Sequence, residues 1–331
     1  MNLEALPRFH LAEFPTPIQH LELFSKACNG PAIFMKRDDI TSLGMGGNKT
    51  RKLEFLIGEA LKQGKDTLVT AGGLQSNHCR LTAAAARKAN LSCHLVLNGE
   101  RPESPNGNLL LDKIFGANVH YCERKERDRR LNQIAEDLLA TGKNPYVIPV
   151  GGSNSIGSAG YVNAMLELET QLKDMHVQLD AIVFATSSGG TQAGLTLGAK
   201  IINFKGQVIG ISIDQTKTGD EPFPPVLTEI ANTTAQRIGF PIHLVEEDFF
   251  LNCDYLGAGY AMPGDIEFNA IRDLAQYEGI LLGPVYTARA MGGLISLIQK
   301  GYFRKDQTVL FWHTGGTPEV FAWANELRSI V

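Results

Sequence analysis

Short apolar segments alternate with amphipathic segments of helical length along most of this chain, and this alternation constrains the fold most strongly. From residue 50 the periodicity predicts helices over 50–63, 77–89, 107–115 and 127–141, with strands over 67–71, 92–97, 118–122 and 146–150. A second series has predicted strands over 181–185, 207–213 and 308–313, with helices over 156–173, 191–203, 226–238, 265–278, 286–299 and 318–327. Nearly continuous apolar strands are typical of parallel sheets that helices cover on both faces. The sequence therefore predicts an α/β fold.

The two series predict two doubly wound open-sheet domains. We expect a large domain of residues 1–48 plus 162–331 and a small domain of residues 49–161. The N-terminal part is predicted to hold a helix over 18–27 and a strand over 32–36. Asp38 and Asp39 follow that strand beside two basic residues, which indicates turn capping and ion pairing rather than catalysis.

Composition excludes several classes of partner. The chain has 331 residues, of which 44% are hydrophobic and 20% charged, and its formal net charge is −4. This balance is ordinary for a globular protein and gives no electrostatic field that would gather nucleic acid. The longest apolar runs are far shorter than the roughly 20 residues of a membrane span, and residues 1–10 lack a signal-peptide core. We expect a small-molecule substrate, with no nucleic acid or membrane partner.

Cysteine usage indicates a reducing compartment, which we take to be the cytoplasm. The five cysteines are widely spaced and contain no C-x-x-C pair, so neither a disulfide framework nor a metal site is expected. Cys79 is a possible nucleophile, although a buried structural cysteine is the more ordinary interpretation. The block 123–130 mixes both signs of charge and is interpreted as a solvated helix face.

A glycine-rich stretch at 44–47 leads through Asn48 to Lys49 at the start of a predicted helix. The stretch fails the nucleotide P-loop pattern because Asn48 separates Gly47 from Lys49. It also fails the dinucleotide pattern G-x-G-x-x-G, since Lys49 occupies the place of the last glycine. On this segment alone, a surface lysine that opens a helix remains an alternative.

The strongest phosphate signal lies at 186–194, between an apolar strand and a helix. Backbone N–H groups around Gly189 and Gly190 and the helix N-terminus form an anion cradle, to which Ser188 and Thr191 add hydroxyl groups. No lysine lies in this segment to neutralise a nucleotide triphosphate, so a terminal phosphate monoester is the more suitable ligand. A tight turn with capping serines is the alternative.

Polar residues also follow the strand at 67–71 and precede the next helix, at the edge where parallel sheets bind ligands. Gln75, Ser76, Asn77 and His78 are candidates for holding a substrate carboxylate. His78 is a candidate base, and the alternative is that it has a capping or structural role.

Two C-terminal segments complete the set of candidates. Thr314, directly after the strand at 308–313, is placed to reach a ring nitrogen, and the glycines that follow it let a flat ring lie against the backbone. Tyr286 is either a proton carrier or a core residue. One lysine, a phosphate cradle, a carboxylate loop and a hydroxyl at a strand end together indicate a Schiff base to a phosphorylated aldehyde, namely pyridoxal 5′-phosphate.

Seven segments over nearly the whole length resemble the D-cysteine desulfhydrase and 1-aminocyclopropane-1-carboxylate deaminase family of fold-type II pyridoxal-phosphate enzymes. They read KRDD at 36–39, GGNKTRKLEFL at 46–56, QSNH at 75–78, YVIPVGGSN at 146–154, SSGGTQAG at 187–194, EGILLGPVYTARAMGGLI at 278–295 and HTGGTP at 313–318. The resemblance implies a homodimer with an architecture like that of the tryptophan synthase β-subunit.

The resemblance also implies roles for individual residues. Lys49 would form the Schiff base beside Asn48, Asn77 would contact the phenolic oxygen of the cofactor, and residues 188–191 would hold its phosphate. Tyr260 and Tyr286 would line the substrate side as catalytic residues together with Lys49 and Ser76.

The departures from the family pattern bear on the reaction. Cyclopropane-opening members usually have a glutamate after the active-site tyrosine and a leucine in the HxGG segment, where this chain has Thr287 and Thr314. A neutral threonine gives a weaker electron sink, which favours release of a good leaving group from Cβ. Gly283 and Arg289 also differ from the usual Asp and Lys.

We therefore expect α,β-elimination from a small amino acid, with D-cysteine giving pyruvate, ammonia and hydrogen sulfide. The alternatives are sulfite release from L-cysteate, 1-aminocyclopropane-1-carboxylate deamination, and a non-catalytic binder of phosphorylated metabolites.

Overall fold

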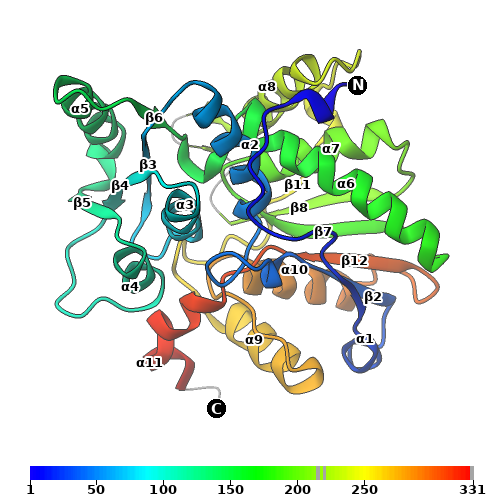
Figure 1. Cartoon of the computed structure of the whole chain (residues 1–331). Coiled ribbons are helices and arrows are strands. Elements are labelled where there is room, and N and C mark those ends of the chain that lie inside the picture. Colours follow the sequence, from blue (N-terminus) through cyan, green and yellow to red (C-terminus); the bar gives the residue numbers. More distant parts are fainter. Residues whose placement is uncertain (214–216, 219–220, 329–331) are drawn as a thin grey trace.

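The chain forms two open sheets with helices on both sides, as the sequence predicts (Figure 1). The computed structural model describes residues 1–213, 217–218 and 221–328. The larger sheet has the strand order β1(Ile18–His20), β2(Ala32–Arg37), β12(Thr308–His313), β7(Ala181–Thr186), β8(Gln207–Ser212) and β11(Phe250–Asn252). All of its neighbouring strands are parallel except β1, which pairs antiparallel with β2. The residues of β7 are all buried, as expected for the middle of a sheet covered on both faces.

The smaller sheet is entirely parallel. Its order is β5(Asn118–Cys122), β4(Ser92–Asn98), β3(Thr67–Gly73) and β6(Pro145–Val147). Figure 1 shows it on the left with α3(Asn77–Lys88), α4(Gly107–Ile114) and α5(Arg127–Ala140) around it. The strands of the two sheets thus come from separate parts of the sequence, while the domain boundaries at 48 and 161 remain a prediction.

The other helices belong with the larger sheet or lie between the two. They are α1(Glu22–Cys28), α2(Lys49–Lys62), α6(Ser155–Met175), α7(Gly190–Ile201), α8(Phe223–Arg237), α9(Asp265–Glu278), α10(Thr287–Gln299) and α11(Ala324–Leu327). Helix α6 packs against both α2 and α7. Within the described part of the chain, no helix is both long and apolar enough to span a bilayer.

Three predictions about secondary structure were wrong. The predicted helix over 18–27 is split, because Ile18–His20 forms an edge strand opposite β2 before α1 begins. The predicted helix over 318–327 is a 3-10 helix over Thr317–Trp323 that becomes α-helical only in α11. The strand predicted over 146–150 ends at Val147, and a 3-10 turn follows at Val150–Gly152. Short strand β11 was not predicted, since three residues carry little periodicity.

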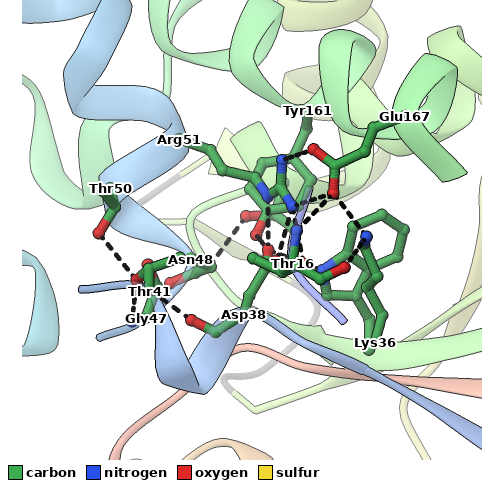
Figure 2. A network of polar contacts seen from close by, with 12 residues as sticks. Thr16, Lys36, Asp38, Thr41, Gly47, Asn48, Thr50, Arg51, Tyr161 and Glu167 are labelled. Atoms are coloured by element: carbon green, nitrogen blue, oxygen red, sulfur yellow. Dashed lines mark hydrogen bonds and ion pairs between the residues drawn. The ribbon is translucent and has the colours of Figure 1, made fainter. Parts of the chain in front are cut away.

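A buried polar network fixes α2 to the larger sheet (Figure 2). Arg51 donates from Nε and Nη2 to the two carboxylate oxygens of Asp38, each at 2.9 Å, and also pairs with Glu167 on α6 at 2.8 Å. Asp38 accepts further hydrogen bonds from Tyr161 Oη and Trp312 Nε1, both at 2.8 Å. Burial alone would raise the pKa of Asp38, but the Arg51 guanidinium outweighs burial and holds this pKa below its usual value. The ion-pairing role predicted for this acid is thereby confirmed, and Asp39 pairs with Arg37 at 2.9 Å.

Candidate active site

A pocket opens at the carboxyl ends of β3, β4, β7 and β12, where ligands bind in open parallel sheets. Residues from both sheets line it. The lining consists of Asn48, Lys49, Gly72, Gly73, Ser76, Asn77, His78, Asn98, Arg124, Arg127, Val150, Gly151, 185–189, Thr191, Tyr260, Tyr286 and Thr314. This set holds four basic side chains including His78, and it contains no carboxylate. The pocket is therefore suited to anionic ligands.

Most of the predicted site residues lie in this one pocket although they are distant in the sequence. Two do not line it. Gly190 is buried behind the wall, where its N–H donates to Ser153 Oγ at 3.1 Å. Gln75 turns toward the start of α4, where its Oε1 accepts from the N–H of Asn108 at 2.8 Å. Because this local contact occupies Gln75, we do not place it at a substrate carboxylate.

Lys49 is the first residue of α2 and is half-buried at the pocket wall. Desolvation lowers the pKa of its ammonium to about 8. Among the described residues, none forms a hydrogen bond or an ion pair with its Nζ. At pH 7 about one-tenth of an amine with this pKa is unprotonated, far more than for an ordinary lysine, so it can act as a nucleophile or as a base.

The loop between β7 and α7 forms the predicted cradle together with a second loop. Ser188 Oγ lies 2.8 Å from Ser153 Oγ, and Thr191 Oγ1 accepts a hydrogen bond from Asn48 Nδ2 at 3.2 Å. The Thr186 hydroxyl is buried without a hydrogen-bond partner in the described structure. Ser153 belongs to the turn before α6, for which the sequence predicted no role.

A second lysine, Lys52, corrects the expectation that the cradle has none. Its side chain is 1% exposed, and Nζ donates to Gly151 O at 3.1 Å and to Ser153 Oγ at 3.3 Å. A Cβ atom at Gly190 would lie 2.9 Å from this Nζ, so the amine is against the cradle. Burial and the nearby Lys49 hold the pKa of Lys52 well below its usual value. The sequence did contain a signal, because residues three apart share one face of a helix.

The N-terminus of α3 supplies the opposite wall. Ser76 is the N-cap and accepts from the N–H of Cys79 at 3.2 Å. Both polar atoms of the Asn77 side chain are hydrogen-bonded. Its Oδ1 accepts from Asn108 Nδ2 at 2.9 Å, and its Nδ2 donates to Glu319 Oε1. Glu319 was missed by sequence reasoning, because nothing local links position 319 to position 77.

His78 is neutral and its tautomer is fixed. Thr70 donates its hydroxyl to Ile148 O at 2.8 Å, so it accepts from His78 Nε2 at 2.9 Å. Burial, with the charges of Lys49 and Lys52, keeps the pKa of His78 well below its usual value. Nδ1 is therefore an acceptor, and it has no hydrogen-bond partner in the described residues. This arrangement agrees better with a structural histidine than with a base.

Two tyrosines face each other on the substrate side of the pocket. Tyr260 Oη lies 2.7 Å from Tyr286 Oη, and the rings meet edge to face with centroids 6.0 Å apart. Arg289 braces the loop that carries Tyr260, because it pairs with Glu267 and donates to Gly259 O and Met262 O at 3.1 Å each. Arg289 thus has a structural role here.

Thr287 and Thr314, which stand where cyclopropane-opening members of the family usually have glutamate and leucine, lie in different environments. Thr287 is fully buried, where its Oγ1 accepts from the N–H of Gly283 at 2.7 Å and lies 3.1 Å from Gly315 O. Thr314 lines the pocket. Of the two hydroxyls, only that of Thr314 is therefore available to a ring nitrogen. A Cβ at Gly283 would lie 2.7 Å from the Gly316 Cα, which explains the absence of a larger residue there.

The interpretation of residues 123–130 as a solvated face is incomplete for two arginines. Arg124 and Arg127 also line the pocket, the first as an exposed side chain and the second as a half-buried one. Their placement depends on how β5 ends relative to the larger sheet, which local charge patterning does not reveal. The described residues contain no cluster of three side chains arranged to hold a metal ion.

Comparisons with known proteins agree with this geometry. The family model described as "Pyridoxal-phosphate dependent enzyme" matches residues 10–315. D-cysteine desulfhydrases from Klebsiella pneumoniae subsp. pneumoniae and Salmonella newport are each 41% identical over 329 residues, which cover 97% of this chain and 98% of theirs.

Solved structures give the same result. A crystal structure described as an ACC deaminase homologue superposes with a TM-score of 0.91 at 38% identity, covering 99% of this chain and 98% of that one. The processed form of threonine deaminase isoform 2 from Solanum lycopersicum, with a TM-score of 0.68 at 17% identity over 99% of this chain and 86% of its own, shares the fold. The chain belongs to the pyridoxal-phosphate-dependent enzymes, and within them to the D-cysteine desulfhydrase and ACC deaminase family.

Proposed function

We propose that this protein binds pyridoxal 5′-phosphate and catalyses α,β-elimination from a small β-substituted amino acid, with D-cysteine as the first candidate substrate. The products would be pyruvate, ammonia and hydrogen sulfide, and one water is consumed. The observation that carries the proposal is an amine with a pKa of about 8, Lys49, in one pocket with an anion cradle and a neutral hydroxyl, Thr314. The similarity to D-cysteine desulfhydrases supports the choice of substrate.

The residues present fit the cofactor. Its phosphate requires N–H, hydroxyl and cationic donors without a nearby carboxylate, and the cradle offers Ser188, Thr191 and Lys52. The unpartnered hydroxyl of Thr186 is a further donor at the same strand end. Thr314 would meet the ring nitrogen, Asn77 the phenolic oxygen, and Lys49 the aldehyde.

When bound, the cofactor supplies an electron sink for the charge that develops at Cα. This chain must then move the proton. Nζ of Lys49 is one acceptor for the Cα proton, since burial lowers its pKa to about 8 and so enlarges its unprotonated fraction near neutral pH. Oη of Tyr286 is the other, and it shares a hydrogen bond of 2.7 Å with Tyr260 Oη in which either hydroxyl can donate.

Substrate orientation would come from the start of α3. The helix N-terminus, the Ser76 hydroxyl and the Asn77 amide form a site for the α-carboxylate. Binding there holds Cα next to Lys49 and Tyr286 in the same pocket. Ring opening of 1-aminocyclopropane-1-carboxylate is disfavoured, because no acid lines the pocket to protonate a ring nitrogen.

One set of measurements tests the proposal. D-cysteine, L-cysteine, L-cysteate and 1-aminocyclopropane-1-carboxylate are supplied to the purified protein, and sulfide, sulfite, pyruvate and 2-oxobutyrate are scored. We expect a yellow protein, sulfide and pyruvate from D-cysteine, and covalent attachment of the cofactor to the Lys49 peptide after borohydride treatment. Lys62→Ala, at the exposed end of the same helix, is the matched control.

Lys49→Ala should lose turnover and the borohydride label together. Retention of both in this variant would refute the assignment of Lys49. A colourless wild-type protein that borohydride does not label would instead indicate a binder of phosphorylated metabolites.

A further inference from the structure

Glu319 is a buried carboxyl behind the pocket, and the proposed reaction gives it no role. It lies in the 3-10 helix that follows β12, and its side chain is fully buried. Asn77 Nδ2 donates to its Oε1, and the N–H of Val285 donates to its Oε2 at 3.3 Å. Because Asn77 belongs to the pocket lining, only one side chain separates this carboxyl from the pocket.

A chain of hydrogen bonds that begins at a backbone carbonyl fixes the orientation of the Asn77 amide. Asn108 Nδ2 lies 2.8 Å from Gln75 O, which can only accept, and the same nitrogen donates to Asn77 Oδ1 at 2.9 Å. Asn77 therefore presents its nitrogen to Glu319. Glu319 accepts one N–H of that nitrogen, and among the described residues none accepts the other. This second N–H is the donor that Asn77 offers to the phenolic oxygen in the proposed function.

Opposing influences act on the charge of Glu319. Burial favours the neutral acid, whereas the N–H of Val285, the Arg80 guanidinium and the Asn77 amide favour the carboxylate. Burial outweighs the others and raises the pKa of Glu319 to about 8. Arg80, on α3, also interacts with the buried Asp112 on α4, so its charge is shared between two acids. Glu319 is therefore mostly a neutral acid at pH 7 and mostly a carboxylate at pH 9.

The charge of Glu319 acts on any anion that Asn77 holds. As a neutral acid, Glu319 accepts one N–H of the Asn77 amide and leaves the other N–H to a negatively charged oxygen in the pocket. As a carboxylate, it places a second negative charge on the other side of the same amide. Two like charges that flank one buried amide repel each other strongly, because the surrounding protein screens them less than water does.

We propose that Glu319 is a positioning residue for the cofactor, which as a neutral acid aligns the Asn77 amide with the phenolic oxygen and as a carboxylate repels that oxygen. This inference rests on the proposed function and extends it to a residue outside the pocket. The cofactor then binds best to the protein in which Glu319 carries its proton. Binding above pH 8 therefore includes the uptake of one proton from solvent by this carboxyl.

The pH dependence of cofactor affinity tests this coupling without any turnover. Dissociation constants of pyridoxal 5′-phosphate are measured by calorimetry at pH 7 and pH 9 on wild-type and Glu319→Gln apoprotein. A carboxyl with a pKa of about 8 that must take up a proton raises the dissociation constant about tenfold over this interval. The ratio of the wild-type constant to the variant constant should rise by this factor. Titration of Lys49 and Lys52 affects both proteins and cancels in the ratio.

A second ligand identifies the oxygen that feels the charge. 3-Deoxypyridoxal 5′-phosphate keeps the phosphate and the aldehyde and lacks the phenolic oxygen, so with this ligand the ratio should stay constant between pH 7 and pH 9. The two ligands can also be compared in the wild type alone, which keeps the test independent of how Glu319→Gln folds. After correction for ionisation of the free ligands, the preference for pyridoxal 5′-phosphate should fall about tenfold from pH 7 to pH 9.

Glu326→Gln removes the same group from an exposed position on α11 and should behave as the wild type. A wild-type-to-variant ratio that does not change with pH would overturn the role of Glu319, and so would an equal change with the analogue. Turnover of D-cysteine and borohydride labelling of Lys49, found beside either result, would leave the proposed function intact. A wild-type apoprotein that does not bind pyridoxal 5′-phosphate at pH 7 would overturn the proposed function and this inference with it.

Discussion

Replacement of Lys52 by methionine should change two properties of the protein in opposite directions. The substitution keeps most of the length of the buried side chain and removes its amine. In the structure this amine lies against the cradle, with Gly151 O at 3.1 Å and Ser153 Oγ at 3.3 Å, and no carboxylate pairs with it among the described residues. It is therefore a buried amine without a counter-ion in the described structure.

The cofactor affinity should fall because a charge-assisted hydrogen bond to the phosphate is lost. Such bonds contribute about 1.5–3 kcal/mol, which corresponds to a dissociation constant about 10- to 150-fold higher. The apoprotein should become more stable. The pKa of Lys52 is lower in the folded protein than in the unfolded chain, so the folded state binds fewer protons and its stability is reduced below pH 10.5. Removal of the amine should relieve about 1–3 kcal/mol, or a rise in Tm of about 1–4 °C.

The assay uses apoprotein that has been stripped of cofactor. Titration with pyridoxal 5′-phosphate, followed by absorbance, gives the dissociation constant, and calorimetric melting of the apoprotein gives the Tm. Lys62→Met, at the exposed end of α2, controls for the loss of a lysine from this helix. A Lys52→Met apoprotein that melts below the wild type and binds the cofactor with unchanged affinity would refute the reasoning.

Two further substitutions test the buried acids. Asp38→Asn should destabilise the protein by about 3–5 kcal/mol, because the buried Arg51 would keep Glu167 but lose the more deeply buried of its two carboxylate partners; the Tm measured by calorimetry should fall by about 4–7 °C. Glu319→Gln should flatten the dependence of apoprotein stability on pH. Burial raises the pKa of Glu319 from 4.5 to about 8, so the folded state holds this proton more strongly and the wild type loses stability as pH rises through that range. Urea unfolding should show that the free energy of unfolding of the wild type falls by about 2–3 kcal/mol between pH 6 and pH 9, and that of Glu319→Gln should not. An equal fall in both proteins would contradict the assignment.

The parts of the site that could be predicted are those with a local cause. A glycine-rich turn between an apolar strand and a helix marks an anion cradle wherever it occurs, because its backbone N–H groups and the helix N-terminus are fixed by local geometry. The loop at 186–191 and the start of α3 at Ser76 were found for this reason. Lys52 was within reach of the same reasoning, since it lies one helical turn beyond Lys49.

Other parts depend on contacts that no local pattern encodes. Glu319 holds Asn77 although the two lie 242 residues apart in the sequence. Arg124 enters the pocket only because β5 ends on the side of the smaller sheet that faces Tyr260. Strand β1 was missed because its three residues adopt the extended form through pairing with β2 rather than through their own pattern.

The glycines before Lys49 are packed tightly against neighbouring backbone. In the structure, a Cβ at Gly46 would lie 1.9 Å from Asp39 O, and a Cβ at Gly315 would lie 2.7 Å from the Gly47 Cα.

The glycine stretch is thus wedged between two turns of the larger sheet, and the N–H of Asn48 donates to Thr314 O at 3.0 Å. This backbone contact sets the distance between Lys49 and Thr314, the two residues proposed to meet the aldehyde and the ring nitrogen. With Arg51 also held by Asp38, the start of α2 is fixed to the larger sheet. Any closure of the pocket must therefore come from the smaller sheet, which brings the proposed carboxylate site at Ser76 and the arginines at 124 and 127.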